Sequence, residues 1–257
     1  MKAHPTAIIE DGAVIDENTN IGPFAVIRSN VKVGSGTTIG PHSIIEGKTT
    51  IGKNNSIGIG VVIGNPPQDL KYNNEDTEVV IGNNNIIREY VTINRGTVEK
   101  GKTVLGNNIM LMSYVHIAHD CHVGDEVILA NCVTLAGHIT IEEQVIVGGI
   151  TPIHQFVSIG RMAIIGGGSR VPKDIPPYCK VAGNPLKIYG LNTVGLRRRN
   201  YSSEEKLQLK RAYRTVFRSK LNTTQAIKKL KSDPQYTSKA VKHMIKFIEN
   251  SQRGICK

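Results

Sequence analysis

The sequence predicts a mainly β fold, a parallel β-helix of hexapeptide repeats followed by a C-terminal α-helical domain. Three observations support this prediction. Aliphatic residues recur at every sixth position over most of the chain, glycine often follows them, and near residue 171 the pattern gives way to helical spacing in a basic segment. A period of six fits neither a helix nor a simple alternating strand, and it is typical of hexapeptide β-helices.

The six-residue repeat begins at Ile9 and continues to Val171. Of the 28 positions in this phase, 25 are Leu, Ile or Val, which chance does not produce. Each hexapeptide would supply one strand and one turn, so three would form a triangular coil of about 18 residues. Glycine or asparagine would relieve crowding at corners with positive φ. The exceptions mark two expected external loops, near residues 65–78 and 95–103, where function tends to lie.

The region after the repeat differs in pattern and in charge. Residues 171–192 are rich in proline and glycine and predict an irregular connector. Ser202 and Glu205 then form a capping-box pattern. The helical stripe that follows comprises Leu207, Leu209, Ala212, Tyr213, Val216 and Phe217, and residues 223–230 and 238–251 also have helical patterns. We therefore predict a β-helix domain over 1–189 and a basic helical domain over 190–257.

The charge distribution indicates an acidic partner for the C-terminal region. From residue 190 onward the chain has 17 Lys and Arg against 4 Asp and Glu, a net charge of +13, whereas the whole chain carries +11. Residues 1–189 therefore carry about −2. Nucleic acid, anionic lipid and an acidic protein are all compatible with this asymmetry.

Composition limits the class of protein. No apolar run approaches the ~20 residues of a membrane span, and the N-terminus lacks the apolar block of a secretory signal. The four cysteines form no CxxC pair, so a disulfide framework is not expected. We expect a cytoplasmic protein with reduced thiols and no stable insertion in a membrane.

The stretch "HIAHDCH", residues 116–122, is the densest chemical motif. Residues 18 apart in the unbroken repeat stack on adjacent coils, about 4.8 Å apart. The period therefore predicts two neighbouring columns, with His154 beside the first of them. One column contains His119, Gly137 and Gln155, and the other contains Asp120, His138 and Phe156.

A zinc site needs three ligands about 2 Å from one ion. His116 and His122 lie one hexapeptide apart, on different walls, so they cannot meet His119 at one ion within the chain. A site shared between subunits stays open. We predict no bound metal and no cofactor.

A general base fits the columns better. A histidine beside a carboxylate, with a backbone N–H one coil away, has the parts for acyl transfer. Here these parts are His119, Asp120 and the N–H of Gly137, which has no side chain to shield it. A solvated, non-functional wall is the simpler alternative, and it applies most to His116 and His122.

Five motifs resemble those of one enzyme family: "HIAHDC", "LAGH", "HQF", "PPQDLKY" and "REYVTINRGT". Together they are similar to those of the bacterial UDP-N-acetylglucosamine 3-O-acyltransferases, and the resemblance extends to "GLRRRNYS" and "SQRGI". It implies a left-handed β-helix and a homotrimer with active sites between subunits. It also implies transfer of a 3-hydroxyacyl chain from acyl carrier protein to UDP-N-acetylglucosamine, with His119 as general base, Asp120 orienting it and the Gly137 N–H as oxyanion hole.

The resemblance also implies the substrate contacts. The residues matched to the sugar, the nucleotide or its phosphates are Gln68, Asp69, Lys71, His116, His138, His154, Gln155, Asn192, Arg198 and Arg199. Gly167 matches the position that measures the acyl chain, and a glycine there implies a longer chain, of about 14 carbons. Val194, Pro185 and Asn94 depart from familiar members, which leaves open whether the sugar carries a 3-hydroxyl or a 3-amino group.

The resemblance identifies the acidic partner as acyl carrier protein bearing a 3-hydroxyacyl-phosphopantetheine. Candidate docking residues in the basic region are Arg197, Lys210, Arg211, Arg214 and Arg218. Rival hypotheses are the lipid A N-acyltransferase, an acetyl-CoA-dependent acetyltransferase, a β-helix carbonic anhydrase and a nucleic-acid binder. The basic region has no recognised nucleic-acid motif, so we predict no nucleic-acid partner.

Overall fold

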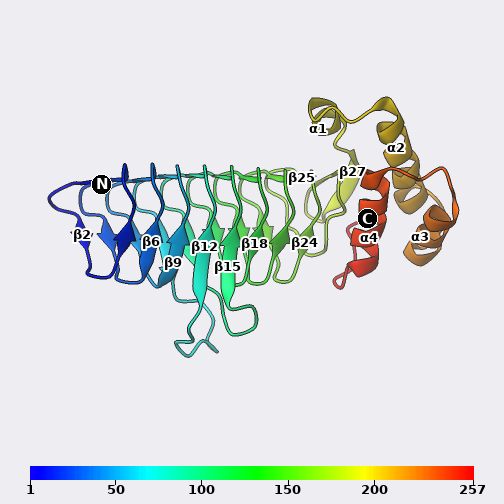
Figure 1. Ribbon diagram of the computed structural model, residues 1–257. Helices are drawn as coiled ribbons and strands as arrows, with labels where there is room; N and C mark the ends of the chain where they lie inside the picture. The colour runs from blue at the N-terminus through cyan, green and yellow to red at the C-terminus, as the bar shows by residue number, and fades with distance from the viewer.

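The computed structural model describes residues 1–257 and has two parts (Figure 1). A long prism of stacked coils begins at the N-terminus, and a cluster of helices covers its other end. The strands form three sheets, one for each wall of the prism, and all neighbours are parallel except the last pair of the first sheet. This is the mainly β, left-handed β-helix fold with C-terminal helices that the sequence predicts.

The strands are short, and up to β25 each sheet consists of every third strand along the chain. The first sheet contains, in order, β1 (Lys2–Ala3), β4 (Asn20–Ile21), β7 (Thr38–Ile39), β10 (Ser56–Ile57), β13 (Ile86–Ile87), β16 (Met110–Leu111), β19 (Ile128–Leu129), β22 (Ile146–Val147), β25 (Ile164–Ile165), β26 (Cys179–Ala182) and β27 (Lys187–Leu191). The second contains β2 (Ile8–Ile9), β5 (Val26–Ile27), β8 (Ile44–Ile45), β11 (Val62–Asn65), β14 (Thr92–Asn94), β17 (His116–Ile117), β20 (Thr134–Leu135) and β23 (Pro152–Ile153). The third contains β3 (Val14–Ile15), β6 (Val31–Val33), β9 (Lys48–Ile51), β12 (Glu78–Ile81), β15 (Lys102–Leu105), β18 (His122–Val123), β21 (Thr140–Ile141) and β24 (Ser158–Ile159).

The repeated aliphatic residue builds the core of the prism. Ile45, Ile63 and Ile117 are fully buried, and each stacks on its counterpart in the next coil. Because the interior is a column of identical contacts, burying these side chains stabilises every coil in the same way. Near the N-terminal tip the column is less enclosed, and its residues Ile9 and Ile15 are only partly buried.

The two expected external loops are present. Residues 66–77 connect β11 to β12, and residues 95–101 connect β14 to β15. Both project from the same region of the prism in Figure 1. Strand pairing resumes in phase after each of them, because Ile63 pairs with Ile93 and Ile93 pairs with Ile117. The loops therefore lengthen two coils without changing which residue faces the core.

Asparagine occupies several positive-φ corners, as expected, but most of the glycines that directly follow an aliphatic residue serve another purpose; Gly64, with φ 89°, is an exception. Most of the positive-φ corners carry residues other than glycine, among them Phe24, Tyr114 and Ile150. A Cβ on Gly34 would lie 2.7 Å from the Gly52 carbonyl carbon, and one on Gly40 would lie 2.4 Å from the Gly58 oxygen. These glycines allow adjacent coils to approach closely; they do not supply left-handed backbone.

The connector over 171–192 is more regular than expected. β26 adds to the first wall in parallel with β25, and β27 then pairs with β26 in antiparallel fashion. The hairpin extends the wall toward the helices, so the boundary predicted at residue 190 falls inside β27. The short apolar alternation of "CKVAG" and "KIYGL" is the signal that proline and glycine content obscured.

Four helices follow: α1 (Thr193–Arg198), α2 (Ser203–Phe217), α3 (Thr223–Ser232) and α4 (Lys239–Asn250). The capping box of Ser202 and Glu205 is confirmed at the start of α2. The sequence patterns did not predict α1. Helical spacing predicts Leu207 in the buried stripe of α2, but it is 46% exposed, whereas Leu209 is fully buried. None of the four helices has both the length and the apolar character that crossing a bilayer requires.

Polar contacts fix the helices against the end of the prism. His243 of α4 places its Nε2 atom 3.0 Å from an oxygen of Glu142. Just after α4, the Ser251 hydroxyl donates to the buried carboxylate of Asp174 at 2.6 Å. These contacts hold the basic helical region in one position relative to the wall that carries the histidines.

Candidate active site

The histidine cluster lies at one corner of the prism, just beyond β17. Asp120 and His138 occupy equivalent corner positions on adjacent coils, with φ values of 59° and 64°. His138 stacks on Phe156 of the next coil, with ring centroids 4.5 Å apart. The two columns predicted from the period are therefore present. Because the same positive-φ corner recurs on each coil, the side chains at successive corners point outward side by side, although their motifs are far apart in the sequence.

His119, Asp120 and Gly137 form a compact unit. The Nδ1 atom of His119 lies 2.9 Å from Oδ2 of Asp120, which leaves Nε2 of the ring without a protein partner. The His119 side chain is 13% exposed and that of Asp120 is fully buried. A carboxylate that accepts from Nδ1–H fixes the tautomer in which Nε2 has a free lone pair, the form a general base needs.

Gly137 lies directly beneath the His119 ring. A Cβ at this position would lie 2.5 Å from Cε1 of His119 and 2.7 Å from Nε2. The Gly137 N–H donates to no backbone or side-chain acceptor in the chain. A side chain here would displace the ring, and an N–H that is not bonded within the protein is free to bind an oxyanion. Gly137 therefore satisfies two requirements, one steric and one electrostatic.

The charge on Asp120 is stabilised by donors around it. Burial alone would raise the pKa of this carboxyl, but hydrogen bonds from His119 and Thr97 outweigh burial and hold the pKa below its usual value. Asp120 is thus ionised near neutral pH. An ionised carboxylate on Nδ1 stabilises the imidazolium that forms when Nε2 takes a proton.

The loop over 95–101 supplies contacts that sequence reasoning missed. The Thr97 backbone N–H and hydroxyl both donate to Asp120, at 3.0 and 2.6 Å. Lys100 donates to the Asp120 carbonyl oxygen at 3.1 Å, and Glu99 lies 3.5 Å from Nε2 of His138. The break in the repeat marked this loop, but no pattern indicated which of its side chains turn inward.

His119, Asp120 and His138 have potential metal-ligand atoms within 4.8 Å of one another. This set differs from His116, His119 and His122, the three histidines that lie together in the sequence. Both oxygens of Asp120 already accept hydrogen bonds, so an ion would have to displace the contacts of Thr97 and His119. We therefore interpret the cluster as a site for proton transfer. The expectation of no bound metal stays a prediction.

The other predicted histidines surround this unit. His116 bonds Thr92 at 2.7 Å, and burial together with the nearby His119 lowers its pKa. Burial also lowers the pKa of His138, although Asp120 and Glu99 oppose that effect. Both rings therefore favour the neutral state near pH 7. His154 and Gln155 lie exposed one coil further along, in positions open to a ligand.

The loop over 66–77 carries Gln68, Asp69 and Lys71. Asp69 accepts from the Lys71 backbone N–H at 3.0 Å, and both Gln68 and Lys71 are exposed. Arg95 bonds Tyr72 at 2.9 Å and so ties this loop to the neighbouring one. No hydrogen bond or ion pair joins these three predicted sugar contacts to the histidine cluster within one chain.

The predicted nucleotide contacts lie around α1. The Asn192 side chain is buried, accepts from the Gly195 N–H at 2.9 Å and donates to the Met162 carbonyl at 2.9 Å, so it caps α1. Arg198 is exposed. Arg199 forms an ion pair with Glu126 on the prism. Asn192 thus has a structural role that its predicted substrate contact did not include.

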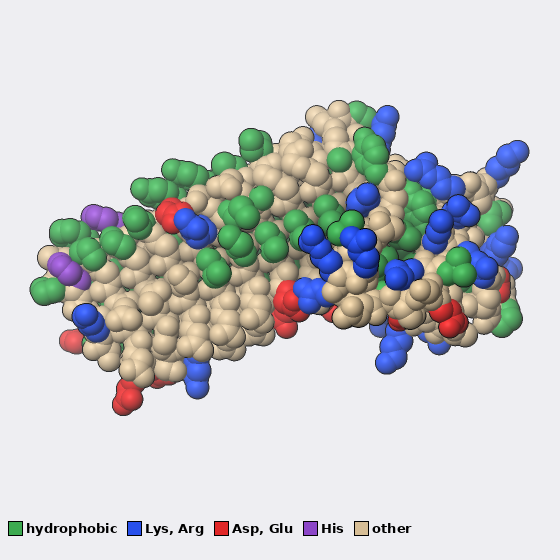
Figure 2. Space-filling view, turned by 90° about the horizontal axis from the view of Figure 1, so that it is seen from above, with side chains coloured by type: hydrophobic (Ala, Val, Ile, Leu, Met, Phe, Trp, Pro, Cys, Tyr) green, Lys and Arg blue, Asp and Glu red, His purple; other side chains and the backbone are tan.

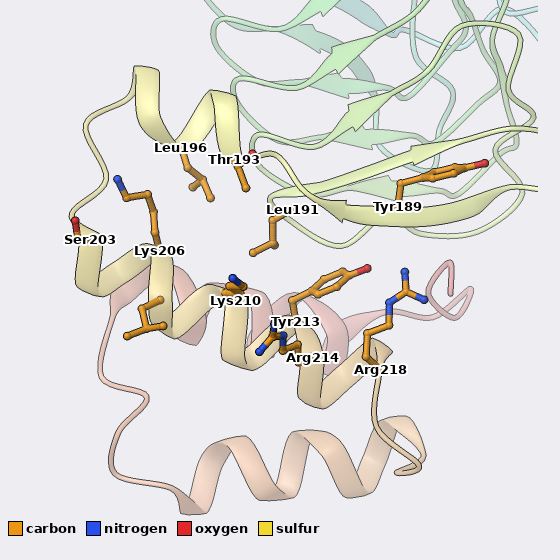
Figure 3. Close-up of a pocket in the computed structure, with 11 residues that line it drawn as sticks. Tyr189, Leu191, Thr193, Leu196, Ser203, Lys206, Lys210, Tyr213, Arg214 and Arg218 are labelled. Carbon is orange, nitrogen blue, oxygen red and sulfur yellow. The ribbon is translucent and has the colours of Figure 1, made fainter.

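A groove of about 620 Å³ separates β27 and α1 from α2 (Figure 3). Its floor is apolar and includes Leu191, Leu196 and Leu207. One edge is a row of cations four positions apart, formed by Lys206, Lys210, Arg214 and Arg218. None of the four forms an ion pair within the chain. Figure 2 shows Lys and Arg gathered over this end of the molecule.

The other predicted docking residues lie outside the row. Arg197 is exposed on α1, and Arg211 bonds Gln235 at 2.9 Å away from the groove. At the predicted chain-length position, Gly167 is exposed on the wall. A Cβ added there would lie 3.2 Å from the Gly149 carbonyl oxygen, a close but adjustable contact.

Comparison with known proteins identifies the family. Residues 174–256 match the family model described as UDP-N-acetylglucosamine O-acyltransferase, domain 2, and residues 12–47 and 102–137 match the bacterial transferase hexapeptide model. An acyl-[acyl-carrier-protein]–UDP-N-acetylglucosamine O-acyltransferase from Aliarcobacter butzleri is 49% identical, covering 98% of this chain and 96% of the relative. A relative of the same name from Paraburkholderia phymatum is 45% identical, covering 99% and 98%.

Solved structures agree. LpxA from Acinetobacter baumannii superposes with a TM-score of 0.97 at 42% identity, covering 99% of both chains. UDP-N-acetylglucosamine acyltransferase from Campylobacter jejuni gives a TM-score of 0.94 at 40% identity, again covering 99% of both chains. Identity at this level over the full length, together with the superposition, leads to one conclusion. The chain belongs to the UDP-N-acetylglucosamine O-acyltransferase family.

Proposed function

We propose that this protein transfers a 3-hydroxyacyl chain from acyl carrier protein to the glucosamine 3-hydroxyl of UDP-N-acetylglucosamine, the first step of lipid A biosynthesis. One observation carries the proposal beyond family membership. His119 lies between a buried, ionised Asp120 and the unbonded N–H of Gly137, with its Nε2 atom free. That arrangement suits proton removal and oxyanion binding at one point.

The chemistry follows from these positions. Nε2 of His119 takes the proton of the sugar 3-hydroxyl as its oxygen attacks the thioester carbonyl carbon. The carbonyl oxygen becomes an oxyanion and accepts from the Gly137 N–H. The C–S bond then breaks, and the phosphopantetheine thiolate leaves with the proton held by His119. Asp120 stabilises the imidazolium between these two proton transfers.

Substrate contacts are proposed on both sides of this unit. Gln68, Asp69 and Lys71 would bind the sugar, and His116, His138, His154 and Gln155 would line its approach to His119. Arg198 and Arg199 would bind the nucleotide phosphates, since guanidinium groups match phosphate geometry. Asn192 would act there by holding α1 in place, through its cap on Gly195.

A homotrimer would complete the site. Within one chain, no hydrogen bond or ion pair joins Gln68, Asp69 or Lys71 to the histidine cluster. A neighbouring subunit would bring such a loop and such a cluster together in one cleft. The apolar corner of the prism, with Tyr114 at 59% and Ile150 at 72% exposure, offers surface for this association.

Acyl carrier protein would dock at the cationic row of the helical region. Lys210, Arg214 and Arg218 are predicted docking residues that belong to the row. Arg197 and Arg211 would extend the positive field without lining the groove. Unpaired cations beside an apolar floor suit an acidic protein that also buries apolar side chains.

The test is transfer from 3-hydroxyacyl-acyl carrier proteins of several chain lengths to UDP-N-acetylglucosamine. Wild type, His119→Ala and His122→Ala would be measured together. His122 is an exposed histidine on a different wall, so it serves as the matched control. We expect His119→Ala to lose about 10²–10⁴-fold in kcat and His122→Ala to keep wild-type turnover.

Two outcomes would redirect the proposal. No turnover by folded wild type would contradict the 3-hydroxyl acceptor, and the same assay with the 3-amino sugar would follow. Turnover that survives His119→Ala would keep the reaction and exclude His119 as its base.

A further inference from the structure

The loop over 95–101 makes an unusually complete set of contacts with one buried group. Thr97 donates twice to the Asp120 carboxylate, through its backbone N–H to Oδ1 at 3.0 Å and through its hydroxyl to Oδ2 at 2.6 Å. The second of these oxygens also accepts from His119. Two donors on one threonine therefore fix both the rotation and the position of this carboxylate.

Burial makes these hydrogen bonds matter. Asp120 is fully buried, and Thr97 is 8% exposed, so bulk water does not compete for either carboxylate oxygen. The Thr97 oxygen also accepts from the Glu99 backbone N–H at 3.4 Å, which leaves its proton directed at Asp120. Removing the hydroxyl would leave one lone pair of a buried anion without a donor, a costly state in a protein interior.

From this geometry we infer that Thr97 is a positioning residue, which holds Asp120 so that His119 keeps its proton on Nδ1 and presents Nε2 to the substrate. The inference rests on the proposed acyl transfer and assigns to a loop residue a part that the histidine motif alone does not contain. Thr97 bonds Asp120 and makes no hydrogen bond to His119 or Gly137, so it acts through Asp120.

Removing the hydroxyl would also change how the pair takes up a proton. Donors to a carboxylate stabilise its ionised form, so losing one raises the proton affinity of the coupled His119–Asp120 pair. The other charged or titratable groups that face this pair are Lys100, His138, His116, the buried Cys121 thiol and, through His138, Glu99. They are unchanged by substitution at Thr97. The acid limb of the pH–rate profile is therefore expected to move to higher pH.

The experiment compares kcat/KM against pH for Thr97→Val, Thr97→Ser and Thr103→Val. Thr103 is a fully buried threonine at the start of the next strand, and its hydroxyl has no partner, so its valine variant controls for loss of a buried hydroxyl. We expect about tenfold lower kcat/KM for Thr97→Val with a raised acid limb. Thr97→Ser, which keeps the donor, and Thr103→Val should both retain the wild-type profile.

A second readout needs no turnover. The 15N shifts of the His119 ring report which nitrogen carries the proton, and Thr97→Val should shift that tautomer population whereas Thr103→Val should not. The inference is overturned if Thr97→Val leaves both the ring shifts and the acid limb unchanged, or if Thr97→Ser is as slow as Thr97→Val with an unmoved limb. Absence of turnover in wild type would contradict the proposed function, and the ring shifts would still test the role of Thr97.

Discussion

The prism and the helical region differ in net charge and in how far their functional side chains are buried. The prism carries about −2 net charge over residues 1–189 and holds its reactive groups buried, with Asp120 fully enclosed and His119 only 13% exposed. The helical region carries +13, and its cationic row lies open and unpaired. Chemistry needs fixed geometry, and docking of an acidic protein needs exposed charge. Changes in the first should lower kcat, and changes in the second should raise KM for the acyl donor.

After loss of His119 itself, the largest effect should come from Gly137→Ala. The added Cβ would meet His119 at 2.5 Å and push the ring away from its position. We expect kcat to fall about 10²–10³-fold, with thermal stability and binding of the nucleotide sugar nearly unchanged. Steady-state kinetics of the single and double variants with His119→Ala would check it. If the loss of kcat in the double variant equals the product of the losses in the two single variants, Gly137 does not act through His119.

Gly167→Met should change which chain is accepted while leaving the base intact. Gly167 is exposed on the wall, so a long side chain there would occupy the space proposed for the distal carbons. We expect kcat/KM for the longest donors to fall about 10- to 200-fold relative to short ones. Competition between donors of two lengths in one reaction gives the ratio directly. An unchanged ratio would remove Gly167 from the acyl path.

Reversing two charges of the cationic row should affect docking alone. Lys210→Glu with Arg214→Glu is expected to raise KM for acyl carrier protein about tenfold or more, with kcat kept and the salt dependence of the rate weakened. Lys228→Glu with Lys229→Glu changes the net charge equally on exposed positions of α3 and is the matched control. Equal effects of the two pairs would mean that overall charge, and not the row, attracts the partner.

The smallest effect should be seen at Ser202→Ala. The Ser202 hydroxyl accepts from the Glu205 N–H at 3.1 Å, so its loss should lower the free energy of unfolding by about 1 kcal/mol. Urea unfolding followed by circular dichroism measures this value. Ser203→Ala, one residue further along, removes an exposed hydroxyl that is not a cap and should change stability much less.

The sequence predicted what depends on periodicity. A fixed spacing of six determines which residues face the core and which stack, so the columns of His119 and His138 followed from counting. The period could not predict contacts that depend on the path of a loop. Thr97 lies in the loop over 95–101, which does not follow the repeat. Nothing in the sequence of this loop indicates that the Thr97 hydroxyl points toward Asp120.

Short-range signals gave mixed results in the C-terminal region. The capping box at Ser202 was sufficient to place the start of α2, since both of its hydrogen bonds are local. The β26–β27 hairpin was missed because proline and glycine outweighed a brief alternation of apolar residues. Leu207 was assigned to the core because helical spacing does not distinguish packing on a neighbour from lining a groove.

The phase of the repeat also restricts how such a protein can change in length. An inserted loop is harmless here because strand pairing resumes on the same wall after it, as Ile63 with Ile93 shows. An extra hexapeptide between residues 120 and 137 would instead turn everything after it by a third of a revolution. His119 and Gly137 would then face different sides of the molecule. Between those positions, duplication or deletion is expected to preserve the active site only when it adds or removes whole coils.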